Sequence, residues 1–118
     1  MTLDDFGNLV VSSGLVTAGR ESAFRTESHA ESALAYAAFL VAKRALTDWQ
    51  CQKLFTGKYK GFIIGRYKLL SHLDDGTNYS RYSAEELHTG TPAILRFFPG
   101  PPTRCIVEPP NDGSPNPN

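Results

Sequence analysis

Long apolar runs and surplus charge are both scarce in this sequence. Its longest apolar run, from Ala33 to Ala42, is too short to cross a bilayer. Twelve Lys and Arg residues balance twelve Asp and Glu residues, so the chain lacks the basic excess typical of proteins that bind nucleic acids or anionic membranes. The first residues, MTLDDF, carry acids where a secretory signal needs a basic leader. These absences predict a cytoplasmic protein that binds neither a membrane nor nucleic acid.

Cysteine and histidine are also rare and scattered. Cys51 and Cys105 lie far apart, as do His29, His72 and His88, and their spacing matches no metal-binding or redox motif. We interpret the two cysteines as unpaired thiols in a reducing compartment, with a disulfide as the alternative. The sequence therefore predicts no metal site and no bound cofactor.

What is present begins with helical patterns. Thr2 is an expected N-cap for a short apolar-periodic segment that ends near Gly14. Thr17 is the expected cap of a second short helix from Ala18 to Arg25.

Two further helices are expected before residue 58. Ser28 followed by Glu31 resembles a capping box and predicts a helix that ends near Arg44. Thr47 and Gln50 form a second such pair, ahead of a short helix that carries Trp49. Trp49 and its apolar neighbours form either the core of this helical segment or a docking surface for a partner, and the sequence leaves both open.

After residue 58 the pattern changes from helical to alternating. The segments FIIGRYKLLSHL, NYSRYSAEEL and PAILRFF predict three strands, joined by hairpin turns at DDGTN and HTGT. Hairpins of this kind give an antiparallel sheet. The expected fold is therefore α+β: a small helical bundle over residues 1–58, a three-stranded antiparallel sheet over 59–99 and a Pro-rich tail over 100–118.

The tail contains most of the eight prolines and excludes a further helix. Its apolar segment, Cys105 to Glu108, is expected either to add an edge to the sheet or to bind a partner. We expect residues 109–118 to be disordered.

The stretches LTDWQCQKLFTGKYKGFIIGRYKLL and PAILRFF carry a resemblance to a known family. Together they resemble the N-terminal region of planctomycete-type bacterial serine/threonine protein kinases, comprising a helical preamble and the first three strands of the N-lobe. The resemblance places the three glycines of the phosphate-binding loop at Asp74, Gly76 and Tyr79, and only Gly76 is kept. Carboxylates and a ring at such positions imply that the phosphate grip is lost.

The resemblance also places the adenine and phosphate contacts of the strands. Arg81 stands where a small aliphatic residue covers the base, and Ile94 stands where alanine makes room for it. Arg96 replaces the lysine that holds the phosphates, and a planar guanidinium is a poor substitute for an ammonium. We expect the Arg96 head to lie in solvent, with a phosphate contact as the alternative.

Neither an H-R-D-x-x-x-x-N catalytic loop nor a D-F-G motif occurs in the sequence. The resemblance therefore implies a non-catalytic, pseudokinase-type N-lobe fragment that is not an enzyme. It would work as a protein-interaction module, through a protein partner or through self-association. The alternative is a nucleotide-binding fragment that needs a separate C-lobe in trans, with Gly76 and Arg96 on the phosphates. A folded remnant without a selected role is a third reading.

Serine and histidine near the hairpins raise the possibility of hydrolase chemistry. Ser80 and Ser83 lie close in sequence to His72 and His88, but no G-x-S-x-G elbow is present. We interpret these groups as surface polar residues.

Overall fold

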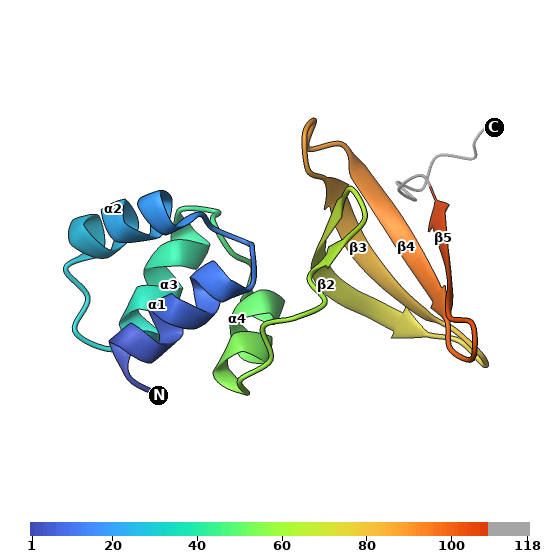
Figure 1. Ribbon diagram of the computed structural model, residues 1–118, viewed down its shortest axis with the longest axis horizontal. Helices are drawn as coiled ribbons and strands as arrows, with labels where there is room; N and C mark the ends of the chain where they lie inside the picture. The colour runs from blue at the N-terminus through green and yellow to red at the C-terminus, as the bar shows by residue number, and fades with distance from the viewer. Residues whose placement is uncertain (109–118) are drawn as a thin grey trace. The chain divides into compact units, whose positions relative to one another are not determined.

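The chain folds as an α+β protein. The computed structural model describes residues 1–108, in which four helices precede a five-stranded antiparallel sheet (Figure 1). The expected fold class is thus confirmed, and the sheet has two strands more than the three expected. The structure divides into two compact units, with the boundary between Gly65 and Arg66. Residues 59–65 therefore group with the helices.

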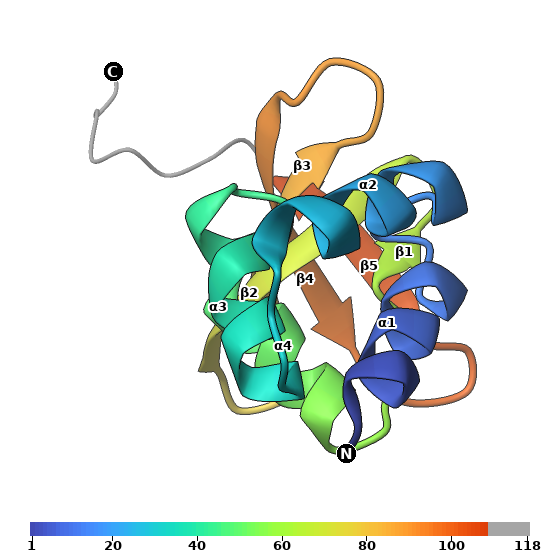
Figure 2. The same ribbon diagram turned by 90° about the vertical axis from the view of Figure 1, so that its left-hand side faces the viewer.

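The helical unit, Met1–Gly65, contains four short helices that lie close to one another in Figures 1 and 2. They are α1 (Leu3–Ser12), α2 (Ala18–Ser28), α3 (Ala33–Ala42) and α4 (Asp48–Phe55). The expected caps at Thr2 and Thr17 are confirmed, because each hydroxyl accepts a hydrogen bond from a main-chain N–H in the first turn. At Thr47 the capping box is complete, with the Gln50 side chain accepting from the Thr47 N–H at 2.9 Å.

The predicted capping box at Ser28 is wrong. Ser28 is the last residue of α2, and the chain leaves that helix at His29, whose φ of 51° is left-handed. The N-cap of α3 is Ser32, whose Oγ accepts from the Ala35 N–H at 3.1 Å. Ser28 instead donates its hydroxyl to the Arg25 carbonyl, as a side chain at a helix C-terminus does.

The two helical hairpins, α1–α2 and α3–α4, repeat each other at a constant interval in residue number. The interval from the cap Thr2 to the cap Ser32 also separates the caps Thr17 and Thr47. The same interval joins equivalent buried and left-handed positions: Phe6 and Tyr36, Val10 and Leu40, Val16 and Leu46, and the positive-φ residues Gly14 and Arg44. The helical unit is therefore an internal repeat of a capped helical hairpin.

The core of this unit forms between the two hairpins. Phe6 stacks on Phe55 with ring centroids 4.8 Å apart and meets the edge of Tyr36 at 6.2 Å. Trp49 packs against this core and contacts Phe62 at 5.7 Å, edge to face. Phe62 is 3% exposed, so the connector after α4 contributes to the same core. Of the two interpretations of Trp49, the structure supports a role in the protein's own packing.

The strands of the sheet follow one another in chain order. They are β1 (Ile63–Ile64), β2 (Tyr67–Asp75), β3 (Ser80–Glu86), β4 (Pro92–Phe98) and β5 (Arg104–Glu108). The pairs β2–β3, β3–β4 and β4–β5 are antiparallel. The expected edge at Cys105 to Glu108 is thus a strand that pairs with β4, whereas the expected disorder of residues 109–118 lies outside the described residues.

Cross-strand register separates the sheet into an apolar face and a charged face, because directly opposite residues share a face. The apolar face carries Leu69, Tyr82, Ala84, Ala93, Leu95, Phe97 and Val107. The charged face carries Lys68, Asp74, Arg81, Glu85, Arg96, Ile106 and Glu108. Two bulges in β2, at Leu70 and Leu73, set which β2 residues reach each face. Within residues 1–108, no helix is long and apolar enough to span a membrane.

Candidate functional site

The hairpin between β2 and β3 holds the residues that the kinase resemblance assigns to the phosphate loop. Its turn is closed by the Gly76 N–H, which donates to the Tyr79 carbonyl at 2.8 Å. The Tyr79 ring folds back onto Gly76, so that a Cβ added at Gly76 would lie 2.1 Å from two ring carbons. Any larger residue here would have to displace the Tyr79 ring, which already covers the main chain at this point.

Asp74 and Arg81 neutralise each other across the same hairpin. Arg81 Nε and Nη2 donate to the two Asp74 carboxylate oxygens at 2.8 and 2.7 Å, in a two-pronged pair. The hydrogen bonds from Arg81 lower the pKa of Asp74, and those to Asp74 raise the pKa of Arg81. The pair leaves neither a free carboxylate to repel a phosphate nor a free guanidinium to bind one.

Arg96 on β4 is held by groups of this chain. Its Nη2 lies 2.8 Å from Glu108 Oε2, and its guanidinium carbon lies 4.5 Å from the centre of the Tyr79 ring. Phe98 flanks that ring at 5.9 Å. The expectation that the Arg96 head lies in solvent is therefore wrong: a carboxylate and an aromatic face hold it on the charged face of the sheet. Its Nε is buried and has no hydrogen-bond partner among residues 1–108.

Register brings the expected nucleotide positions together on one face. Arg81 on β3 is directly opposite Arg96 on β4, and Ile94 lies two residues before Arg96 on β4, on the same face. Ile94 is 8% exposed, so the place assigned to the adenine base is filled by a packed side chain. Sequence reasoning found Gly76 and Arg96 as positions but missed Glu108 as the partner of Arg96. That pairing depends on β5, which the sequence indicated only as a possible edge.

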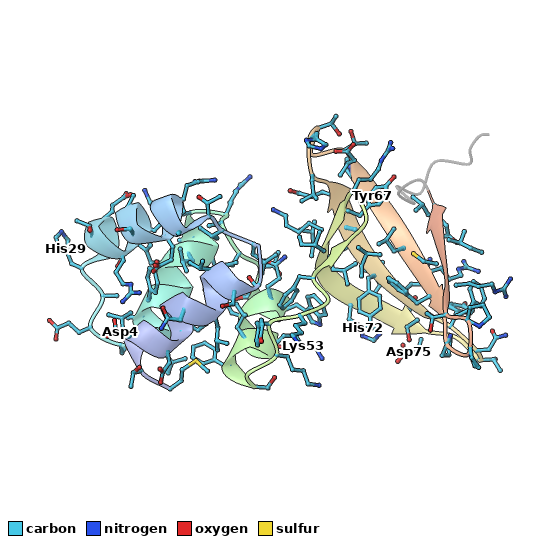
Figure 3. The ribbon with its side chains drawn as sticks, in the orientation of Figure 1. Asp4, His29, Lys53, Tyr67, His72 and Asp75 are labelled. Atoms are coloured by element: carbon cyan, nitrogen blue, oxygen red, sulfur yellow. The ribbon has the colours of Figure 1, made fainter. Side chains whose placement is uncertain are left out.

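The histidine and serine of the hydrolase hypothesis meet on the apolar side of the same hairpin. Figure 3 shows His72 and Asp75 close together towards the end of β2, away from Tyr67 at its start. Asp75 Oδ1 accepts from Ser80 Oγ at 2.6 Å and lies 2.9 Å from His72 Nε2. The Ser80 and His72 hydrogen bonds lower the pKa of Asp75. The carboxylate bridges serine and histidine here, whereas a nucleophilic serine needs the histidine between it and the acid.

The remaining serine and histidine also engage other groups. Ser83 shares a hydrogen bond of 2.6 Å with Ser71 across β2 and β3. The His88 N–H donates to the Glu86 carboxylate in the β3–β4 turn, and this bond lowers the pKa of Glu86. Both interactions close local structure, in agreement with the interpretation of these residues as surface polar groups.

An open pocket of about 560 Å³ lies at the other end of the strands. Tyr67, Ala93 and Val107 supply its apolar wall, and Arg66 and Glu86 lie at its polar side. Arg66 Nε is 3.7 Å from Glu86 Oε2, so the charges at the pocket are loosely paired with each other. Its lining includes neither Gly76 nor Arg96, the two nucleotide positions predicted from the sequence, but it includes Val107 and Glu108 of the predicted edge segment.

Cys51 and Cys105 are both free thiols, one buried in α4 and the other exposed on β5. Burial raises the pKa of Cys51 to about 11 and raises the pKa of Cys105 as well. Within residues 1–108, no group of three or more His, Cys, Asp or Glu side chains is arranged to hold a metal ion.

Comparisons of this chain with protein-family models, curated proteins and solved structures find no match. The resemblance to the N-lobe of serine/threonine kinases stays a prediction from the sequence.

Proposed function

We propose that this chain is a non-catalytic, kinase-N-lobe-like module that works by binding protein rather than nucleotide. The proposal is supported by the way in which the side chains on the charged face, near the β2–β3 hairpin, pair with one another. Each group that would touch a nucleotide there is already engaged: Arg81 by Asp74, Arg96 by Glu108 and Tyr79. A triphosphate would have to displace two ion pairs and an aromatic ring before it gained a contact.

Exposed apolar side chains support the protein-binding half of the proposal. Ile106 and Val107 on β5 are 46% and 47% exposed, and Leu34 on α3 is 73% exposed. α3 is apolar all round, and such helices usually have a neighbour on every side. Single exposed apolar residues are common, but two adjacent ones on an edge strand fit strand addition by a partner.

A specific observation favours the alternative, a nucleotide-binding fragment completed by a separate C-lobe. The buried Arg96 Nε lacks a partner among residues 1–108, and an unsatisfied buried donor costs about 1 to 3 kcal/mol. A phosphate oxygen would satisfy it, as would a water molecule. Under this alternative, Arg96 and the Gly76 main chain would contact the phosphates.

Thermal unfolding with and without magnesium ATP separates the two. A ligand present at about a hundred times its Kd stabilises a folded protein by about 2.7 kcal/mol, which is several degrees in Tm for a small domain. We expect the full chain to melt at the same temperature with and without millimolar magnesium ATP. A saturable rise that Arg96→Ala abolishes and Lys58→Glu preserves would establish the alternative, since Lys58 is exposed and lies in the helical unit.

We further propose that the protein works in the cytoplasm and makes no use of nucleic acid or membranes. Two free thiols and a net charge of zero support this placement. Fractionation of the native cell tests it, and recovery of the chain in an exported or membrane fraction would contradict it.

A further inference from the structure

The edge strand β5 carries a pattern that is complementary to itself. β5 is the last strand in the sheet order, and among residues 1–108 it pairs with β4 alone (Figure 1). An edge strand presents a row of main-chain N–H and C=O groups that a further strand can bond. This available edge is short, because prolines at 101, 102, 109 and 110 bracket it in the sequence and proline has no N–H to donate.

Within that short segment, R-C-I-V-E, the charges at the two ends are opposite and Ile106 stands in the middle. An antiparallel copy of the same strand, centred on Ile106, would place each Arg104 opposite the Glu108 of the other copy. Opposite charges facing across strands stabilise a sheet, and like charges destabilise it. Moving the two-fold axis from Ile106 to Cys105, a slip of two residues, would place Arg104 opposite Ile106 and would leave both charges without a partner.

Both faces of the sheet favour the register centred on Ile106. On the charged face, the two exposed Ile106 side chains would meet each other between the two ion pairs. On the apolar face, Cys105 of each copy would lie opposite Val107 of the other, which joins a small apolar thiol to an exposed valine. Glu108 holds Arg96 on its own chain at 2.8 Å, and a carboxylate has a second oxygen to accept from another guanidinium.

We propose that β5 pairs with β5 of a second copy of this chain, antiparallel and with its two-fold axis at Ile106. The inference deepens the protein-binding half of the proposed function by naming the partner and the surface. Pairing of five-residue strands alone buries much less than the roughly 1,200 Å² of a standard stable interface. The dimer is therefore weak and forms in a concentration-dependent way.

Charge reversal at the ends of β5 provides a test with an internal rescue. Arg104→Glu places acids opposite acids at both ends of the dimer, and Glu108→Arg places bases opposite bases. Each variant should dimerise at least about tenfold more weakly than the wild type, because two attractive cross-strand pairs become repulsive. An equimolar mixture of the two variants restores both ion pairs in the mixed dimer, and its association should return to near the wild-type level. Lys58→Glu, an equal change of charge on an exposed residue outside the sheet, should leave association unchanged.

Sedimentation equilibrium of the full chain over micromolar to millimolar concentrations measures all five samples. Recovery in the mixture also demonstrates that both variants are folded, and circular dichroism melting of each variant alone checks this independently. A wild type that stays monomeric at millimolar concentration would overturn the proposal. So would charge variants that all dimerise like the wild type, a result that would point instead to another surface such as the apolar face of α3.

The outcome is distinguishable from failure of the proposed function. If the wild type does not dimerise and magnesium ATP leaves its Tm unchanged, only the β5–β5 pairing is refuted and the proposed function stands. If the wild type dimerises through β5 and also binds ATP through Arg96, the proposed function is refuted and the strand pairing stands.

Discussion

Tyr36→Phe removes one hydroxyl from the centre of the helical unit and leaves the ring. Tyr36 is fully buried, and its hydroxyl donates to Glu21 Oε2 at 2.8 Å. The same oxygen accepts from Arg25 Nε at 2.8 Å. Glu21 is 7% exposed, so the lost donor leaves a buried carboxylate with one hydrogen bond fewer. Phenylalanine is already the residue at the equivalent position of the first hairpin, Phe6, so we expect the ring to keep its packing.

The expected cost follows from the charge of the acceptor. A hydrogen bond to a charged group contributes about 1.5 to 3 kcal/mol, more than a neutral pair. We expect the free energy of unfolding to fall by about 2 kcal/mol, which corresponds to about 10 °C in Tm for a unit of this size. Burial is the main cause that raises the pKa of Tyr36, with the Glu21 hydrogen bond second. The hydroxyl therefore remains a donor at neutral pH.

Urea unfolding followed by tryptophan fluorescence measures the stability of the helical unit, which contains Tyr36. Trp49 is the only tryptophan in the chain and packs against the helical core. Tyr59→Phe is the matched control, because the Tyr59 side chain packs on the same core without a hydroxyl partner among residues 1–108. A Tyr36→Phe midpoint as close to the wild type as that of the control would refute the claim that Tyr36 supports a buried carboxylate.

Three further predictions concern the hairpin and the thiols. Gly76→Ala should lower stability by about 1 to 2 kcal/mol in thermal melting, because the new methyl group displaces the Tyr79 ring from its cation and aromatic contacts; an unchanged Tm would contradict the closed hairpin. Asp74 has a lowered pKa, so its ion pair contributes stability above about pH 4 that is lost as the pH falls through the lowered value; carboxyl NMR titration should give a pKa below that of a free aspartate, and a value near 3.9 would refute the pair. Cys105 should react with a thiol reagent at least about tenfold faster than Cys51, whose thiol is buried and has a pKa of about 11. Equal rates in the folded chain would contradict the burial of the Cys51 thiol in α4.

Local sequence signals predicted most of the elements. Caps at Thr2, Thr17 and Thr47 succeeded because a hydroxyl next to an apolar-periodic segment has one strong local partner, the N–H in the first turn. The same rule failed between α2 and α3, where Ser28 and Ser32 both precede helical sequence. Which serine caps the helix depends on where α2 ends, and α2 ends at His29, whose left-handed φ of 51° stops the helix before Ser32.

The contents of the candidate site depend on register, which the sequence does not specify. The bulges in β2 place Asp74 opposite Arg81. The carboxylate that was expected to repel phosphate therefore forms an ion pair with the Arg81 guanidinium. The pairing of Arg96 with Glu108 needs β5 to add to β4 after a proline-rich turn. Contacts of this kind form between segments distant in the chain, and alternation of apolar and polar residues alone cannot assign them.

We propose that the chain's own side chains occupy the charged face of the sheet, where the kinase resemblance would place a nucleotide. The most direct measurement is an NMR titration of the full chain with a non-hydrolysable ATP analogue and magnesium, following the Gly76 amide and the Arg96 Nε–H. The account predicts that neither signal moves, since Tyr79 covers the glycine and Glu108 holds the guanidinium. Saturable shifts of both signals at the same ligand concentration would contradict it.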